Sequence, residues 1–184
     1  MTPLSPSSAP YTSLQTARLI LRQLDFLDQD ALYELRSNPD VNKYLDRPVP
    51  GSRQDVIDFI EKINAGILLN QSFYWAITLL NNSKLIGTIC LWNFSKTHNQ
   101  AEIGYELNPA YQGLGLMQEA MSKVVEFGFE ALRLNSILAS THKENKRSIH
   151  LLEKYGFSKA NEELDDPLKE TMVYTLRRNN AFGL

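Results

Sequence analysis

Apolar and polar positions along this chain follow two rhythms, which together predict the order of its helices and strands. Alternating or continuous apolar runs predict strands over residues 18–24, 73–80, 84–93, 100–107, 136–141 and 172–176. Apolar residues spaced three and four positions apart predict helices over residues 28–37, 52–70, 116–132 and 145–155. A polar turn at residues 81–83 joins two strands as a hairpin, whereas helices connect the later strands.

This order predicts an α/β layered fold in a single domain. The middle strands are joined as antiparallel neighbours, and the later strands are joined by helical crossovers. A sheet built in this way is mixed and mostly antiparallel, and helices must cover both of its faces. The length of 184 residues suits one domain with a substantial core, and the chain shows no internal repeat or linker.

The two ends of the chain differ in composition from the middle. Residues 1–13 are rich in Ser and Pro, so we expect a flexible tail over residues 1–15, a domain over residues 16–178 and a short tail over residues 179–184. No basic segment followed by an apolar run opens the chain, and no run reaches the roughly 18–20 apolar residues of a membrane span. We therefore expect a cytoplasmic protein that does not contact a membrane.

Composition and charge exclude only a few functions and structural features. The apolar fraction of 43%, the charged fraction of 22% and the net charge of −2 are ordinary for a globular protein and do not indicate binding to nucleic acid. Cys90 is the only cysteine, so an internal disulfide is excluded, and its apolar surroundings predict a small buried side chain. A local basic cluster is formed by His142, Lys143, Lys146 and Arg147.

The most informative segment is residues 108–120, between a predicted strand and the helix that follows. Gly113 and Gly115 lie just before the helix start. A glycine turn that leads into a helix exposes several backbone N–H groups at the positive end of the helix dipole. This arrangement binds anions, most often phosphate groups.

Two common phosphate-binding motifs do not fit this turn. A Walker A loop needs four residues between its glycines, followed by Lys, and neither requirement is met. A dinucleotide fingerprint needs Gly or Ala where Gln118 stands, and it normally follows the first strand of a domain. On the glycine pair alone, a simple tight turn is equally acceptable.

The wider pattern is more specific. Residues 102–120 resemble the central Gln/Arg-x-x-Gly-x-Gly/Ala motif of the GNAT superfamily of acyl-CoA-dependent N-acetyltransferases, with Gln112 and Gly115 matching and Met117 departing at the small position. Asn145-x-x-Ser148 and residues 152–157 resemble a signature of the Rim-type branch, which acetylates ribosomal-protein N-termini. The resemblance spans residues 16–176. It implies a GNAT domain whose sheet has a splayed strand at the acyl-CoA site.

The resemblance also implies acetyl-CoA as cosubstrate and no metal. Backbone N–H groups of the turn would bind the pyrophosphate, and the strand before the turn would pair with the pantetheine amides. The expected cofactor-binding residues are Tyr105, Glu106, Leu107, Gln112, Gly113, Leu114, Gly115, Leu116, Met117 and Asn145. The basic cluster would meet the 3′-phosphate or remain a solvated loop.

Acetyl transfer needs a base for the amine, a donor for the carbonyl oxygen and a proton for the departing thiolate. Glu102 and Glu106 share one face of a regular strand, and we favour Glu102 as the base. A backbone N–H near Leu107 would polarise the thioester. Ser148 would hydrogen-bond the thiol or merely cap its helix with Asn145.

One departure from the family pattern keeps a second function open. Many superfamily members carry a general-acid Tyr where this chain has Leu152. The main prediction is transfer of acetyl to a primary amine by direct attack in a ternary complex. The alternative is a non-catalytic acyl-CoA-binding or sensor module.

The acceptor is left open by the sequence. A peptide N-terminus and a small-molecule amine both fit, and the expected partners are acetyl-CoA and this amine, with a homodimer possible. Aspartates near the variable helices would suit a cationic acceptor such as a polyamine, or form a charged surface: Asp40, Asp46, Asp55 and Asp58. Tyr44, Trp75 and Trp92 are the aromatic candidates for the acceptor pocket. The three His residues show no metal-ligand spacing.

Overall fold

Eight strands form one open sheet in the order β1-β2-β3-β4-β5-β6-β8-β7. The computed structural model describes residues 11–95, 97, 99–160, 164–166, 168 and 170–181. The strands are β1 (Leu14–Gln15), β2 (Leu19–Arg22), β3 (Phe73–Leu79), β4 (Asn82–Ser95), β5 (Gln100–Leu107), β6 (Ser136–His142), β7 (Ser158–Lys159) and β8 (Thr171–Arg177). Neighbouring strands pair antiparallel except β5 and β6, which pair parallel. The predicted mixed, mostly antiparallel sheet is confirmed.

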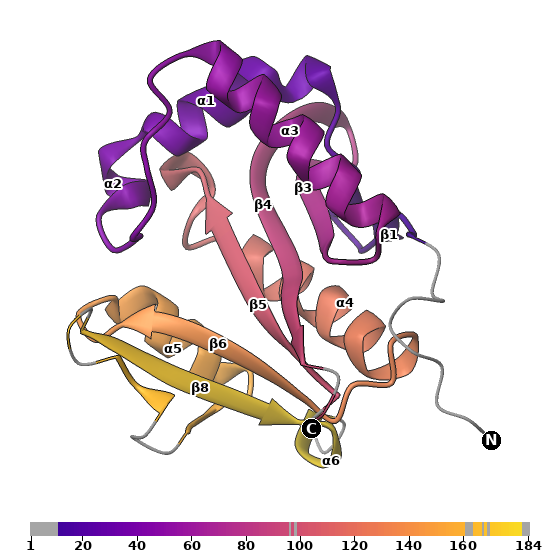
Figure 1. Ribbon diagram of the computed structural model, residues 1–184, viewed down its shortest axis with the longest axis vertical. Helices are drawn as coiled ribbons and strands as arrows, with labels where there is room; N and C mark the ends of the chain where they lie inside the picture. The colour runs from indigo at the N-terminus through magenta and orange to yellow at the C-terminus, as the bar shows by residue number, and fades with distance from the viewer. Residues whose placement is uncertain are drawn as a thin grey trace.

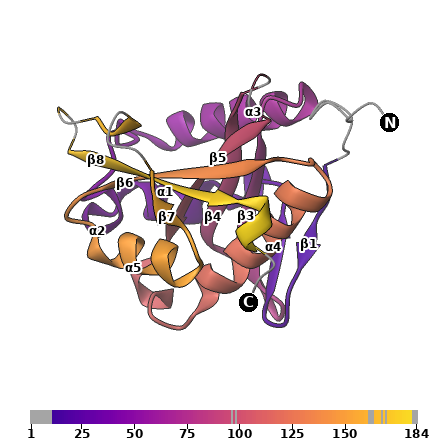
Figure 2. The same ribbon diagram turned by 90° about the horizontal axis from the view of Figure 1, so that it is seen from below.

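Helices cover both faces of this sheet, as the sequence predicts (Figures 1 and 2). They are α1 (Gln29–Ser37), α2 (Pro39–Asn42), α3 (Arg53–Leu68), α4 (Leu116–Glu130), α5 (Lys146–Lys154) and α6 (Arg178–Ala181), with 3-10 turns at Phe26–Asp28 and Pro109–Tyr111. Helices α1 and α3 lie on one face, and α4 and α5 lie on the other (Figure 2). Each face buries its own hydrophobic cluster, because the sheet separates them.

Helix ends follow the capping residues that the sequence contains. At the start of α3, Ser52 Oγ accepts a hydrogen bond from the backbone N–H of Asp55, and the Asp55 carboxylate accepts one from the backbone N–H of Ser52. At α5, the Asn145 side chain accepts from the backbone N–H of Ser148 at 3.2 Å. Gly156 follows α5 at φ 95°, a left-handed conformation that ends a helix and favours glycine.

The folded region begins earlier than residue 16. Strand β1 pairs with β2, and residues before it contact β3: the Tyr11 hydroxyl donates to the Tyr74 carbonyl at 3.1 Å, and Trp75 Nε1 donates to the Thr12 carbonyl at 2.9 Å. At the other end, Arg178–Ala181 form α6. These short pieces, like α2 and β7, are too brief to show a periodic pattern.

Alternation along β5 assigns its side chains to the two faces. Ile103 and Leu107 lie in the cluster that packs against α4. Glu102, Gly104 and Glu106 have the opposite parity, so they point to the face covered by α1 and α3. The two carboxylates therefore share a face, as the sequence predicts.

The sheet splits between β5 and β6. These strands pair only where residues 100–102 of β5 face residues 136–138 of β6. Beyond Glu102 the two strands diverge, and Figure 1 shows the gap widening toward the ends of both strands. The predicted splayed strand is therefore present, and it leaves the edge of β5 from Ile103 to Leu107 unpaired with β6.

Candidate active site

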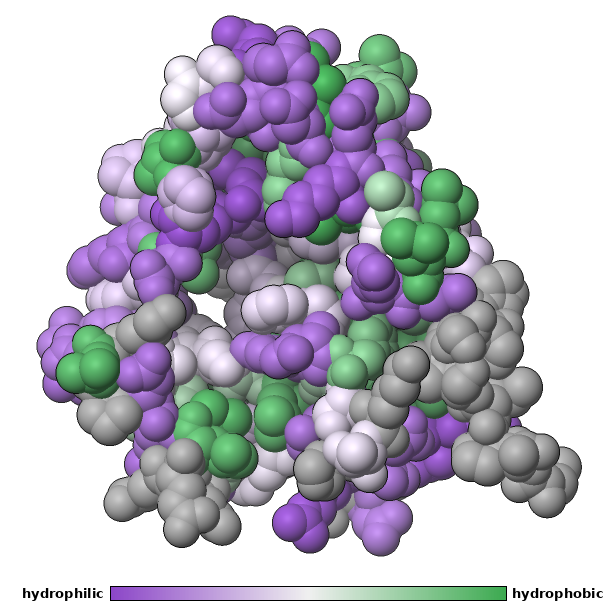
Figure 3. Space-filling view, in the orientation of Figure 1, coloured by the Kyte–Doolittle hydropathy of each residue, from purple (hydrophilic) through white to green (hydrophobic). Residues whose placement is uncertain are grey.

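The split opens into a hollow on the molecular surface. Figure 3 shows this hollow between the part built by α1 and α2 and the part built by β6 and β8. Tyr44, which follows α2, stacks on His142 at the end of β6, with ring centroids 5.3 Å apart and an interplanar angle of 28°. This contact joins the two parts across the open end of the split.

The glycine turn lies on the α4 face. Gly113 and Gly115 have φ values of 77° and 75°, the left-handed region where a side chain is strained. A Cβ on Gly113 would meet no atom within 4 Å, so the backbone there is open to a ligand. The first helical hydrogen bond runs from the backbone N–H of Glu119 to the Gly115 carbonyl, leaving the N–H groups of residues 116–118 without an intrahelical partner. The turn thus has the donor set that a pyrophosphate needs.

Side chains from the start of the fold hold this turn in place. Arg18 Nε lies 2.7 Å from Glu119 Oε2, and Arg18 Nη1 donates to the Leu114 carbonyl at 3.0 Å. Thr16 Oγ1 donates to Glu119 Oε1 at 2.5 Å. Burial opposes ionisation of Glu119, but these bonds lower its pKa. Sequence reasoning missed this support, because it joins residues far apart in the chain.

Gln112 connects the turn to the end of β5 and to α5. Its Nε2 donates to the Leu107 carbonyl at the end of β5 at 2.9 Å, and its Oε1 accepts from Arg147 Nη1 at 2.6 Å. Lys143 instead forms an ion pair with Glu170. Of the basic cluster, Arg147 is therefore the member that contacts the turn.

Two hydroxyls meet at the split. Tyr105 and Ser148 are hydrogen-bonded to each other at 2.8 Å between β5 and α5. Burial raises the pKa of Tyr105 to about 12, although the bond to Ser148 works in the opposite direction, so the phenol stays protonated at neutral pH. The Ser148 hydroxyl faces Tyr105, while its backbone N–H is the group capped by Asn145. The Tyr105 phenol was not foreseen from the sequence. Leu152, at the family's tyrosine position, is fully buried.

The two carboxylates of β5 have different surroundings. Glu106 is buried, and its Oε2 lies 2.5 Å from Arg47 Nη2. Its Oε1 accepts from Thr88 Oγ1 at 3.1 Å and lies 3.9 Å from Arg36 Nη1. Glu102 is partly buried and accepts one long hydrogen bond, 3.5 Å, from Asn93 Nδ2. Glu106 is therefore committed to a buried ion pair, whereas Glu102 retains room to accept a proton.

The remaining candidate residues separate into core and surface. Trp75 is fully buried on the α4 face, so it does not line an acceptor pocket. Trp92 keeps 48% of its surface exposed. Asp55 belongs to the helix cap, and Asp58 accepts a hydrogen bond from Gln54.

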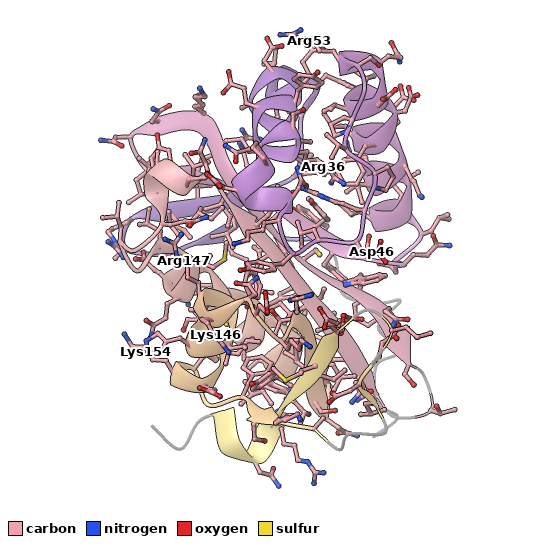
Figure 4. All side chains as sticks on the ribbon, turned by 90° about the vertical axis from the view of Figure 1, so that its left-hand side faces the viewer. Arg36, Asp46, Arg53, Lys146, Arg147 and Lys154 are labelled. Atoms are coloured by element: carbon pink, nitrogen blue, oxygen red, sulfur yellow. The ribbon has the colours of Figure 1, made fainter. Side chains whose placement is uncertain are left out.

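Basic side chains lie on both sides of the split: Arg36 and Arg47 beside Glu106, and Lys146 and Arg147 on α5. Figure 4 shows Lys146 and Arg147 on one side of the cleft and Asp46 on the other. His142 Nδ1 accepts from the backbone N–H of Glu144 at 3.2 Å, and its Nε2 lies 3.3 Å from Glu170. Within the described residues, no group of three or more His, Cys, Asp or Glu side chains is arranged to hold a metal, and no helix is long and apolar enough to cross a membrane. His98 lies outside the described residues.

Sequence comparison places this geometry among known proteins. The family model "Acetyltransferase (GNAT) domain" matches residues 18–158. The uncharacterized N-acetyltransferase YoaA of Bacillus subtilis (strain 168) is 37% identical over 146 residues, which cover 79% of this chain and 82% of YoaA. The spermidine N(1)-acetyltransferase of Escherichia coli (strain K12) is 35% identical over 72 residues, or 39% of each chain.

Solved structures show the same fold. The GNAT-family acetyltransferase from Bacillus anthracis has a TM-score of 0.78 and 26% identity, covering 91% of this chain and 99% of that one. Mycobacterium smegmatis RimJ in complex with CoA-disulfide has a TM-score of 0.75, covering 88% of this chain and 82% of that one. Its identity is 18%, so this second likeness concerns the fold alone.

Proposed function

Because this chain belongs to the GNAT acetyltransferase family, we propose that it transfers acetyl from acetyl-CoA to a primary amine by direct attack in a ternary complex. Membership confirms the predicted superfamily and enzyme class. One observation carries the finer proposal. The split between β5 and β6 brings the glycine turn and the Tyr105–Ser148 pair together on one face, with Glu102 on the other.

The donor side supports acetyl-CoA by its chemistry. Backbone N–H groups at the start of α4 suit a pyrophosphate, and the unpaired edge of β5 suits the pantetheine amides, which pair with a strand edge as another strand would. Arg147 is held beside the turn by Gln112, where it would meet a phosphate. The other predicted contacts, through Leu114, Leu116, Met117 and Asn145, remain predictions.

We assign the chemical roles by surroundings. When bound, acetyl-CoA supplies an activated thioester. Glu102 accepts the proton of the attacking ammonium group, directly or through water, because its carboxylate is less occupied than that of Glu106. A backbone N–H near Leu107 polarises the thioester carbonyl. As the amine nitrogen bonds to the acetyl carbon and the C–S bond breaks, the thiolate takes a proton from the Tyr105–Ser148 pair, and the proton that the nitrogen then loses restores the pair through water.

A second candidate function is a non-catalytic acyl-CoA-binding module. It is kept because Leu152 is a core residue at the position where many members of the superfamily carry a general acid. In that case the chain binds acyl-CoA without turnover. A cytoplasmic location, a homodimer, and the choice between peptide N-terminus and small molecule also remain predictions.

Calorimetry with acetyl-CoA, followed by a free-thiol assay across peptides, diamines and aminoglycosides, tests the proposal. We expect saturable binding and thiol release that depends on an amine. Binding without release from any acceptor would favour the non-catalytic module, and no binding at millimolar acetyl-CoA would remove both functions.

A further inference from the structure

Strand β4 is irregular where it passes the acceptor face of the split. Its pairing with β5 shifts register between Trp92 and Ser95, and Asn93 adopts φ 52°. Asn tolerates this conformation better than most residues, and the shift begins only after Trp92, which pairs in regular register with Glu102. Regular alternation therefore places the Trp92 side chain on the face covered by α1 and α3, next to the irregular end of β4.

Trp92 lies open beside the split. Its side chain keeps 48% of its surface exposed, although tryptophan favours burial. Its Nε1 is 3.7 Å from where a Cβ on Gly104 would stand, so the indole extends over the part of β5 that has no side chain. The ring lies on the same face as Glu102 and Glu106, because Trp92 and Glu102 are opposite each other in the strand pair.

Glu102 is the direct cross-strand partner of Trp92. Side chains opposite each other in an antiparallel pair have Cβ atoms about 5 Å apart. An aromatic ring face and a carboxylate are thus neighbours, and both of these groups attract cations.

The nearby cations do not occupy this pair. Arg47 lies against Glu106, and Arg36 stacks on Phe59 with its Cζ 3.9 Å from the ring centroid. Lys146 and Arg147 belong to α5, on the other face of the sheet. Within the described residues no basic side chain forms an ion pair with Glu102, so a cation from outside the chain can approach Trp92 and Glu102.

We propose that Trp92 determines acceptor specificity, binding a second ammonium group of a short aliphatic diamine or polyamine while Glu102 serves the reacting amine. The second group is the one that suits the ring. A cation–π contact stabilises the charged form, which would hinder the reacting amine, since that amine must lose its proton. A second amine a few methylenes away from the reacting one can reach the ring while the reacting amine stays at Glu102.

This inference rests on the proposed amine acetylation, and matched acceptors test it. Initial rates of thiol release are measured at saturating acetyl-CoA with 1,4-diaminobutane and with 1-aminobutane, which differ only in the second amine. We expect the wild-type KM for the diamine to be about tenfold lower. Trp92→Leu should abolish this preference, whereas Trp92→Phe should keep most of it because a ring face remains.

Controls separate specificity from folding. Both variants should bind acetyl-CoA with unchanged Kd and keep a melting temperature close to that of wild type. Equal KM values for the two amines in the wild type, or equal losses in both variants, would overturn the proposal.

Fluorescence gives a readout that does not need turnover. Trp92 is exposed and Trp75, the other tryptophan, is fully buried. Titration with 1,4-diaminobutane should change the emission of the wild-type protein and leave that of Trp92→Phe unchanged; an unchanged wild-type signal contradicts diamine binding. Failure of thiol release with every amine defeats the proposed function instead, and this titration still decides the subsite.

Discussion

The two sides of the split between β5 and β6 differ in the groups that they expose. The donor side is mostly backbone: a glycine turn, the first N–H groups of α4 and the free edge of β5. The acceptor side is mostly side chains, among them Arg47, Glu106, Trp92 and Glu102. Backbone donors suit the phosphates and amides that every acyl-CoA shares, whereas side chains can differ from one protein to the next. On the proposed function, backbone groups would bind acetyl-CoA, the substrate that all members of the family share. Side chains would bind the acceptor, which differs from one member to the next.

The largest effect on kcat should come from the acceptor side, where the proposed acetyl transfer depends on the Glu102 carboxylate. Glu102→Gln should lower kcat about a hundredfold, because the general base is lost while the site keeps its shape. The Kd for acetyl-CoA should not change. Thiol release at saturating acetyl-CoA and amine measures this kcat.

Glu106→Gln is the matched control on the same face. It weakens the buried ion pair with Arg47, so a lower melting temperature is expected together with a kcat close to that of wild type. If Glu106→Gln lowers kcat about a hundredfold and Glu102→Gln does not, the two carboxylates have been assigned the wrong way round.

The next largest effect should come from the donor side, where a substitution that strains the glycine turn should weaken the binding of acetyl-CoA. Gly115→Val places a β-branched side chain at φ 75°, with its Cβ 3.5 Å from Arg18 Nη2. Strain of about 2 kcal/mol corresponds to roughly thirtyfold weaker acetyl-CoA binding by calorimetry. Gly66→Ala, in α3, should bind normally, since no positive φ is involved. Unaltered affinity in Gly115→Val would mean that the turn is not the pyrophosphate site.

The hydroxyl pair at the split should have a smaller effect. Ser148→Ala should reduce kcat about tenfold with little change in the acceptor KM, and Tyr105→Phe should show a similar loss if the two hydroxyls act together. Because the pKa of Tyr105 is raised to about 12, wild-type kcat should show no loss from phenol ionisation below about pH 10. Normal kcat in both variants would remove the pair from the mechanism.

Arg147→Ala should have the smallest effect, since its side chain is exposed. We expect about threefold to fivefold weaker binding of acetyl-CoA, decreasing as salt is added. Comparison with 3′-dephospho-acetyl-CoA identifies the phosphate involved. A loss that persists with this analogue assigns Arg147 to the pyrophosphate rather than the 3′-phosphate.

The same contrast explains what the sequence could predict. The donor side depends on local signals: strong apolar periodicity over α4, glycines at left-handed positions, and Asn145 as a cap. The acceptor side depends on contacts between distant segments, such as Arg47 with Glu106. Residue spacing places both glutamates on one face, but only the packing of α1 and the loop after α2 shows that one of them is occupied.

The exposure of the two tryptophans could not be predicted from the sequence either. Trp75 and Trp92 both stand in apolar strand sequence, yet one is fully buried and the other is half exposed. The two side chains lie on opposite faces of the sheet: Trp75 packs in the cluster under α4, whereas Trp92, opposite Glu102 of β5, points to the other face near the end of β4.

The stacking of Tyr44 on His142 has a topological consequence. The contact joins the two parts across the open end of the split between β5 and β6. The protein therefore forms a closed loop around the split. On the proposed function, an acceptor would have to reach the split end-on. We therefore expect free chain termini and slender amines to react, and a lysine in the middle of a folded surface to be excluded.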